Sequence, residues 1–273
     1  MTPSTPSPRD LAGGWAITAR EGFTDAARYL RSIPLDEWNG PTGCTKWTIR
    51  DLAGHIVGEA VWFPNLVRGA TRGEPAHSMQ LYEDLKKLPE EELTDRIDAS
   101  AAEIEFAIAE ATPDDLHKEV DLGFTKMPVW QATSISAFEG VFHNWDARAG
   151  REPDTKIPTP WAQQVAYSMV EMAPWFAHRT ALAGAQGTYL LQVGVGVGPI
   201  TVSIQGDDLT VTQGATGTPD VTLHLDADQY VRLIAGRLKL DSEQGKQVQI
   251  DGDRGKLGGL GRVFAGIANE DQS

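Results

Sequence analysis

The segment that decides the fold reads FEGVFHNWD and runs from Phe138 to Asp146. It lies in a longer apolar stretch that begins after Pro128 and reaches about Arg148, and its apolar residues recur with the spacing of a helix. We therefore predict one long helix here. Glu139 and His143 are four residues apart, so their side chains leave the same face of this helix about one turn from each other.

A carboxylate and an imidazole in this arrangement can bind one divalent ion if a third ligand comes from another helix. His55 is the best candidate, because it lies in the middle of a predicted helix on the same side as Leu52 and Ile56. Two histidines and one carboxylate leave coordination positions open, which is typical of catalytic rather than structural metal sites. Asp146 lies one turn beyond His143 and is placed to orient its ring.

The same spacing also arises from ordinary salt links. His55 and Glu59 are four residues apart on another predicted helix, and Glu171 and His178 lie two turns apart on a third. The pair in residues 138–146 differs because bulky apolar residues surround it, and a buried charged group generally needs a partner. A metal ion is one such partner, and a solvated salt link or a capped polar pair in the core is the alternative.

The helical spacing extends from about Arg9 to about Ala183 and predicts an antiparallel bundle with short connections. Thr48 followed by Asp51 is the acidic form of a capping box, and Thr112 marks a similar helix start. The expected helices cover residues 10–33, a segment from 48 to about 69 or 73, residues 89–111, a segment from 112, residues 128–148 and residues 160–182.

After Gly184 the pattern changes to short runs of β-forming residues between Gly, Pro and Asp. The expected strands are residues 189–195, 200–205, 209–213, 221–225 and 248–250, with helices at 226–235 and 259–268. The Gly206-Asp207-Asp208 step predicts a hairpin turn. We therefore predict an α+β protein of two domains: a helical bundle in residues 1–184 and a small α+β domain in residues 185–273.

The composition restricts the partners and the compartment. The formal net charge of -14, without a block of Lys and Arg, argues against a nucleic-acid partner. Residues 1–8 lack the apolar core of a signal peptide, and no apolar run is long enough to cross a bilayer, so we expect no membrane partner and a cytoplasmic location. Cys44 is the single cysteine, which rules out an internal disulfide and suits a reducing compartment. We expect a buried structural thiol there rather than a nucleophile.

Residues 41–55, PTGCTKWTIRDLAGH, resemble the opening signature of the DinB-like, mycothiol-dependent maleylpyruvate isomerase family. The resemblance implies a helical bundle in which a histidine of this segment, His55, joins the Glu and His of an E-x-x-x-H-x-x-D stretch as metal ligands. Glu139, His143 and Asp146 match that stretch residue for residue. The metal that we expect is Zn2+, and the resemblance adds Asp146 as a candidate catalytic residue.

The C-terminal part resembles a sterol-carrier-protein-like α+β domain, through residues 234–237, IAGR, and 250–253, IDGD. Arg237 matches an arginine that has a functional role in this family. The resemblance therefore makes Arg237 a candidate catalytic and cofactor-binding residue, which could clamp a carboxylate of the substrate or of a thiol conjugate. The alternative is a cation that stabilises the end of a helix.

The resemblance also implies a low-molecular-weight thiol, typically mycothiol, as cofactor or co-substrate. The leading hypothesis is a metal-dependent S-transferase that attaches this thiol to a small-molecule acceptor. The second is a maleylpyruvate-type cis-trans isomerase that adds the thiol and expels it again. A third, from another class, is a protein that binds a small molecule or a lipid without catalysis.

Overall fold

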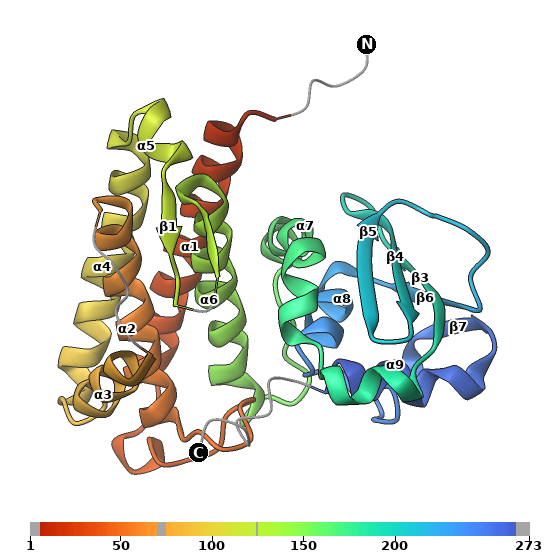
Figure 1. Ribbon diagram of the computed structural model, residues 1–273. Helices are drawn as coiled ribbons and strands as arrows, with labels where there is room; N and C mark the ends of the chain where they lie inside the picture. The colour runs from red at the N-terminus through yellow and green to blue at the C-terminus, as the bar shows by residue number, and fades with distance from the viewer. Residues whose placement is uncertain (1–5, 70–74, 124, 266–273) are drawn as a thin grey trace. The chain divides into compact units, whose positions relative to one another are not determined.

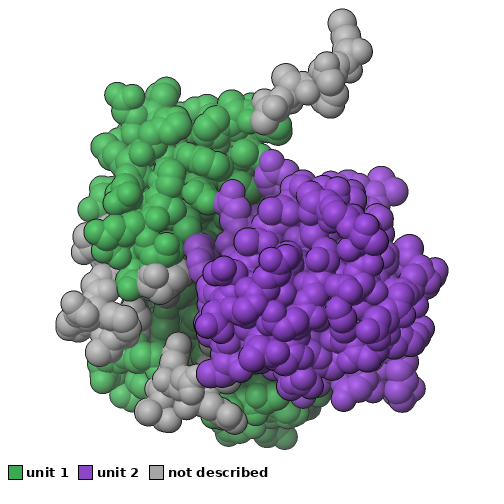
Figure 2. Space-filling model, turned by 45° about the vertical axis from the view of Figure 1, so that its right-hand side comes forward, with its two compact units in different colours: residues 1–157 green, residues 158–273 purple. Residues whose placement is uncertain are grey.

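The computed structural model describes residues 6–69, 75–123 and 125–265 and divides the chain into two compact units, Met1–Ile157 and Pro158–Ser273 (Figure 2). The sequence analysis instead expects the domain boundary at 184–185. The difference is due to α7 (Thr159–Phe176), which packs against α8 (Ala227–Ile234) and β5 (Asp208–Gln213) and therefore groups with the second unit.

Unit 1 is a bundle of long helices with a short hairpin, and Figure 1 shows the long helices side by side. α1 packs against α4 and α6, and α2 packs against the same two helices. The elements are α1 (Pro8–Arg31), a 3-10 turn (Leu35–Glu37), α2 (Ile49–Val67), α3 (Pro75–Leu85), α4 (Glu90–Glu110), α5 (Pro113–His117), β1 (Glu119–Asp121), β2 (Lys126–Pro128) and α6 (Val129–Ala149). The predicted bundle is confirmed, and α3 and the hairpin are additions.

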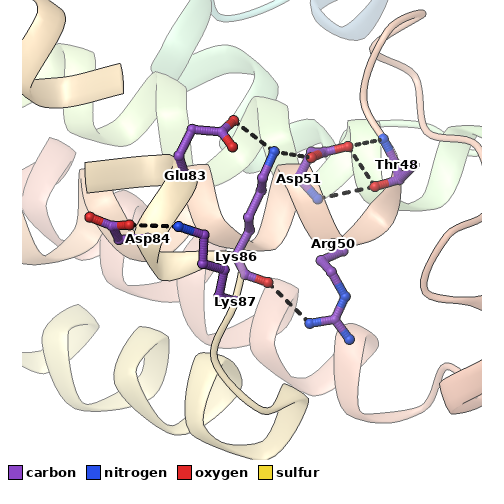
Figure 3. Close-up of polar contacts among 7 residues, drawn as sticks. All are labelled: Thr48, Arg50, Asp51, Glu83, Asp84, Lys86 and Lys87. Carbon is purple, nitrogen blue, oxygen red and sulfur yellow. Dashed lines mark hydrogen bonds and ion pairs between the residues drawn. The ribbon is translucent and has the colours of Figure 1, made fainter. Parts of the chain in front are cut away.

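The predicted start of α2 is confirmed and is tied to the end of α3 (Figure 3). The Thr48 hydroxyl accepts from the Asp51 backbone N–H, while the Asp51 carboxylate accepts from the Thr48 backbone N–H at 3.0 Å. Lys86 Nζ donates to the same carboxylate at 3.1 Å, and Arg50 donates to the Lys86 carbonyl at 3.1 Å. These bonds set where α2 begins, at Ile49, six residues before His55.

Two glycines let α1 and α6 approach each other closely. A Cβ atom added to Gly22 would lie 2.7 Å from the carbonyl carbon of Gly140, and one added to Gly140 would lie 2.9 Å from the Ala19 carbonyl oxygen. Such contacts are too short for a side chain, so glycine lets the two backbones touch. Because Gly140 follows Glu139, this contact fixes the position of the candidate ligands of α6 along the bundle axis.

Unit 2 contains a five-stranded sheet in the order β5-β4-β3-β6-β7. All neighbours are antiparallel except β3 and β6, which pair in parallel with Tyr189 opposite Val221. The other strands are β3 (Gly187–Val193), β4 (Gly198–Gln205), β6 (Val221–Leu225) and β7 (Gln249–Gly252). The predicted hairpin turn between β4 and β5 is confirmed, with Gly206 at a positive φ of 63°.

α7 packs against β5, and α8 packs against β3 and β6. α9 (Leu257–Val263) follows the last strand in the sequence. The side chain of Asp226 caps α8 by accepting from the Gln229 backbone N–H. Residues 266–268, the expected end of the last helix, lie outside the described residues. Among the helices that are described, none combines the length and apolar character needed to cross a membrane.

Candidate metal centre

The structure brings His55 of α2 together with Glu139 and His143 of α6. Oε2 of Glu139 lies 3.1 Å from Nε2 of His55 and 3.0 Å from Nε2 of His143. The two imidazole rings meet edge to face, with centroids 4.7 Å apart. One carboxylate oxygen and two ring nitrogens therefore converge on a common point, with the donor atoms within 4.8 Å of one another.

Burial and mutual charge perturb this cluster. Burial opposes ionisation of Glu139, but the positive charge of His143 and hydrogen bonds from both histidines outweigh it and lower the pKa of the carboxyl. Burial also disfavours charged His143, yet Glu139 and the hydrogen bond to Asp146 raise its pKa well above the ordinary value. A metal ion that binds Nε2 displaces the proton of this imidazolium–carboxylate pair.

Asp146 orients His143 from the other side of the ring. Its Oδ2 atom accepts from Nδ1 of His143 at 2.9 Å, and the residue is completely buried. Such a carboxylate–histidine contact fixes the tautomer, so that Nε2 is free of a proton when it meets a metal. The role expected for Asp146 from its position one turn after His143 thus agrees with its contact.

Aromatic side chains surround His55. Its ring centroid lies 4.8 Å from that of Trp47 and 4.9 Å from that of Tyr82, and Trp47 also approaches His143 at 5.9 Å. Nδ1 of His55 is buried and has no hydrogen-bond partner among the described residues. Of the two ring nitrogens of His55, only Nε2 has a polar contact in the described part of the chain, and this contact is with Glu139.

These residues fit a divalent metal. Two imidazole nitrogens and one carboxylate oxygen are the ligands that catalytic zinc sites use, and they leave coordination positions open. The Nε2 atoms face the shared carboxylate oxygen, and Asp146 supplies the outer contact that such a histidine normally makes. His55, Glu139 and His143 are therefore our candidate ligands.

The other two spacings noted in the sequence do not converge in this way. Glu59 is buried, and its carboxylate accepts a hydrogen bond from the hydroxyl of Tyr82. Within the described part of the chain, Glu59, Glu171 and His178 belong to no group of three metal-donor side chains. The candidate centre differs from the other two histidine–glutamate spacings because its donor atoms converge in space. Spacing along one helix does not reveal this convergence.

Arg237 belongs to unit 2 and follows the end of α8. Gly236 takes a positive φ of 72°, and the Arg237 backbone N–H donates to the Arg232 carbonyl at 2.7 Å, which closes the helix. Nη1 of Arg237 lies 3.4 Å from the Ala235 carbonyl oxygen, as a cation at a helix end would. The alternative role as a carboxylate clamp stays a prediction.

Sequence reasoning missed one participant, Cys44. Its expected burial is confirmed, but its Sγ atom also lies 3.1 Å from Oδ2 of Asp146. Cys44, His143 and Asp146 form a second group of potential metal donors, which shares His143 with the first. Separation of 102 residues along the chain hides this contact from any local pattern.

Comparisons with known proteins agree with both units. Residues 19–148 match the family model of the mycothiol maleylpyruvate isomerase N-terminal domain, and residues 175–265 match the SCP-2 sterol transfer family. Crystal structures of a mycothiol-dependent maleylpyruvate isomerase and of its histidine-to-alanine mutant are both similar to this chain. Each shows 19% identity and a TM-score of 0.60, over 90% of this chain and 96% of the other. A comparison with curated proteins gives no match.

Fold and site together define a class: a helical bundle with converging histidine and carboxylate side chains, followed by a sterol-carrier-like α+β domain. Within this class, the chain belongs to the DinB-like mycothiol-dependent maleylpyruvate isomerase family, with the N-terminal domain of that family and a C-terminal domain of the SCP-2 family. The resemblance noted in the sequence is therefore confirmed.

Proposed function

We propose that this protein is a metal-dependent enzyme that uses mycothiol to modify an electrophilic small molecule, with His55, Glu139 and His143 as the metal ligands. The observation that carries the proposal is the convergence of Nε2 of both histidines on Oε2 of Glu139, at 3.1 and 3.0 Å. The match of residues 19–148 to a mycothiol maleylpyruvate isomerase domain supports the choice of thiol. Zn2+ is the metal that suits this ligand set best.

The chain's own groups set the charge of the centre. Two neutral imidazoles and one carboxylate contribute a single negative charge, so a divalent ion among them keeps a net positive charge that favours an anionic ligand. A metal bound there lowers the pKa of a coordinated thiol, so that a thiolate exists at neutral pH. Trp47 and Tyr82 border His55 with aromatic surface, which lowers the local dielectric and strengthens these interactions.

The leading form of the proposal is S-transfer. The thiolate sulfur forms a lasting bond to an electrophilic carbon of the acceptor, while that carbon either loses a leaving group with its electron pair or gives up a π bond whose electron pair takes a proton. One thiol is consumed for each product. Arg237 is the residue that we expect to bind a carboxylate of the acceptor or of the conjugate.

The second form is cis-trans isomerisation, which the similarity to crystal structures of a mycothiol-dependent maleylpyruvate isomerase supports. The thiolate sulfur bonds to one carbon of a conjugated carbon–carbon double bond, and the π electron pair moves onto the conjugated carbonyl. The carbon–carbon bond, now single, rotates; the electron pair returns to form the double bond again, and the carbon–sulfur bond breaks. The thiol returns unchanged, so thiol stoichiometry distinguishes the two forms.

The first test is metal content of purified protein, measured for wild type, His55→Ala and a matched control, His224→Ala. His224 also faces a carboxylate, Asp251 at 2.9 Å, but on the surface of unit 2. We expect one Zn2+ per chain in the wild type and the control, and loss in His55→Ala. Absence of metal from all three after reconstitution would contradict the proposal and favour a binding role.

The second test follows free thiol while metal-loaded protein acts on maleylpyruvate and a panel of other electrophiles with mycothiol. Loss of one thiol per product indicates transfer, and a constant thiol concentration with loss of the cis substrate indicates isomerisation. No reaction with any acceptor by protein that does hold the metal would contradict the catalytic proposal.

A further inference from the structure

The carboxylate of Asp146 receives two donors on one oxygen. Nδ1 of His143 approaches Oδ2 at 2.9 Å, and Sγ of Cys44 approaches the same atom at 3.1 Å. The thiol S–H donates because the carboxylate only accepts. Cys44 therefore contacts the group that orients a candidate ligand, and its thiol also lies within reach of the His143 ring.

The loop before α2 is built to make this contact. The Gly43 backbone N–H donates to the Asp146 carbonyl at 2.7 Å, and the Cys44 backbone N–H donates to the Thr42 hydroxyl at 3.0 Å. A Cβ atom on Gly43 would lie 2.3 Å from Oδ1 of Asp146, so only glycine allows the loop to lie this close. At the end of α6, Gly150 likewise makes room for the Pro41 carbonyl.

Burial gives the contact its weight. Asp146 is 0% exposed and Cys44 is 5% exposed. A buried carboxylate is costly unless donors satisfy it, and it moves toward whatever donors are present. Without the thiol donor, the Asp146 carboxylate would depend more on its bond to the His143 ring. It would therefore hold that ring less firmly in place.

We propose that Cys44 is a positioning residue of the metal centre: its thiol holds the Asp146 carboxylate, and the carboxylate holds His143 with Nε2 toward Glu139 and His55. This inference rests on the proposed function, since it assigns His143 as a ligand. It gives the cysteine a role as a hydrogen-bond donor and not as a nucleophile or as a metal ligand.

The competing role is direct metal binding by Cys44, His143 and Asp146, whose donor atoms also lie close together. Two features favour hydrogen bonding. The distances of 2.9 and 3.1 Å both end on the same carboxylate oxygen, as donor–acceptor pairs do, and Nε2 of His143 points away, to Glu139. Metal binding through sulfur has a spectroscopic signature that hydrogen bonding lacks.

The experiment compares full-length wild type with Cys44→Ser, Cys44→Ala and Cys44→Val. Serine keeps an O–H donor, alanine removes the donor, and valine fills the space without one. The matched control is Thr133→Ala, which removes a buried hydroxyl donor of α6, bonded to the Val129 carbonyl at 2.9 Å. Thr133 lies ten residues before His143, or about 15 Å along the helix.

The first readout is Zn2+ affinity, from competition with a chromophoric chelator. Loss of an outer contact typically weakens metal binding by about 10- to 100-fold, and we expect about tenfold in Cys44→Ala and Cys44→Val. Cys44→Ser and Thr133→Ala should bind as the wild type does. If Cys44→Ala does not fold, the pair Cys44→Ser and Cys44→Val carries the comparison.

The second readout is the absorption spectrum of the Co2+-loaded proteins. We expect no thiolate-to-cobalt charge-transfer band in any of them, and a change of the visible bands in Cys44→Ala but not in Thr133→Ala. Unchanged Zn2+ affinity in Cys44→Ala and Cys44→Val overturns the positioning role. A charge-transfer band that disappears in Cys44→Ser overturns it in favour of a metal ligand. Absence of metal from the wild type overturns the metal centre itself, and this inference with it.

Discussion

Buried charges occur in both units, and they differ in how they are arranged. In unit 2, Arg232 and Asp228 are 3% and 5% exposed and form two parallel hydrogen bonds of 2.9 and 2.7 Å, while the third contact of Arg232 goes to Gln244 at 2.8 Å. Opposite charges match one to one there. In unit 1, two imidazoles share a single oxygen of Glu139.

The comparison shows that burial of charge does not by itself indicate a functional site. The Arg232 guanidinium donates to both carboxylate oxygens of Asp228, so the two groups satisfy each other and do not form a binding point for a ligand. In the Glu139 cluster two ring nitrogens share one carboxylate oxygen, and a divalent cation could replace the protons that the histidines donate to it. Convergence of three potential metal-donor atoms is the feature that distinguishes the candidate metal centre.

The largest expected effect concerns the balanced pair. Arg232→Ala leaves the Asp228 carboxylate buried without its cation, and we expect a loss of about 3–5 kcal/mol in the free energy of unfolding. Urea denaturation followed by circular dichroism measures it. The double variant Asp228→Leu/Arg232→Met, with no charge left to compensate, should recover most of that loss. An equal loss in both variants would contradict this account of the pair.

For the candidate metal centre, we expect the free energy of unfolding to depend on the presence of the metal ion. Zn2+ at about 100 times its dissociation constant should stabilise the wild type by about 2.7 kcal/mol, and a chelator should remove this gain. His143→Ala should abolish both the gain and catalytic activity while retaining the helical circular dichroism signal. Full activity in that variant would count against the site. Arg232→Ala, although less stable, should keep the whole Zn2+-dependent gain.

Asp25 of α1 is an intermediate case, because a quarter of its side chain, 26%, is exposed. Burial opposes its ionisation, but hydrogen bonds from Asn144 and Arg148 outweigh burial and lower its pKa below the ordinary 3.8. Because the pKa of Asp25 is lower in the folded state, its carboxylate contributes stability in full when the pH is above the ordinary pKa of the unfolded chain. This contribution is lost as the pH falls through the lowered pKa of the folded state.

We therefore expect Asp25→Asn to cost about 1 kcal/mol at neutral pH, the usual scale for a partly exposed charged hydrogen bond. Urea denaturation of both proteins from pH 7 to pH 3 measures the difference. It should be constant down to about pH 4 and shrink below that value. A difference that grows with acidity would have the wrong sign for this mechanism.

The smallest effect belongs to the exposed pair, His224 and Asp251 of unit 2. It repeats the histidine–carboxylate contact of the metal centre at 2.9 Å, but in water. His224→Ala should change the free energy of unfolding by no more than about 0.5 kcal/mol, as measured by urea denaturation. A larger cost would show that the contact alone, without burial or convergence, carries free energy here.

Much of this structure could be predicted from local chemistry. The capping box of Thr48 and Asp51, the long helix after Pro128 and the turn at Gly206 depend on neighbouring residues, and all three are confirmed. α3 was not expected from the sequence, and in the structure contacts from α2, such as Asp51 with Lys86, hold the chain at its end.

The candidate site was predictable in part for the same reason. Glu139 and His143 share a helix face by spacing, whereas the addition of His55 required the packing of α2 against α6. The contact of Cys44 with Asp146 was beyond local reasoning, because it depends on a loop that approaches α6 through Gly43. The compact units also divide 27 residues before the expected domain boundary, since the apolar face of α7 packs in unit 2.

The order of strands in unit 2 has a consequence for synthesis on the ribosome. Every candidate metal ligand is translated before residue 157, so the whole bundle has been made when unit 2 begins to emerge. The sheet of unit 2 cannot be completed in the same stepwise way, because β6 is flanked by β3 and by β7, the last strand of the sheet. A pause in translation between residues 225 and 249 therefore leaves one side of β6 unpaired, and such an open strand edge invites association between nascent chains.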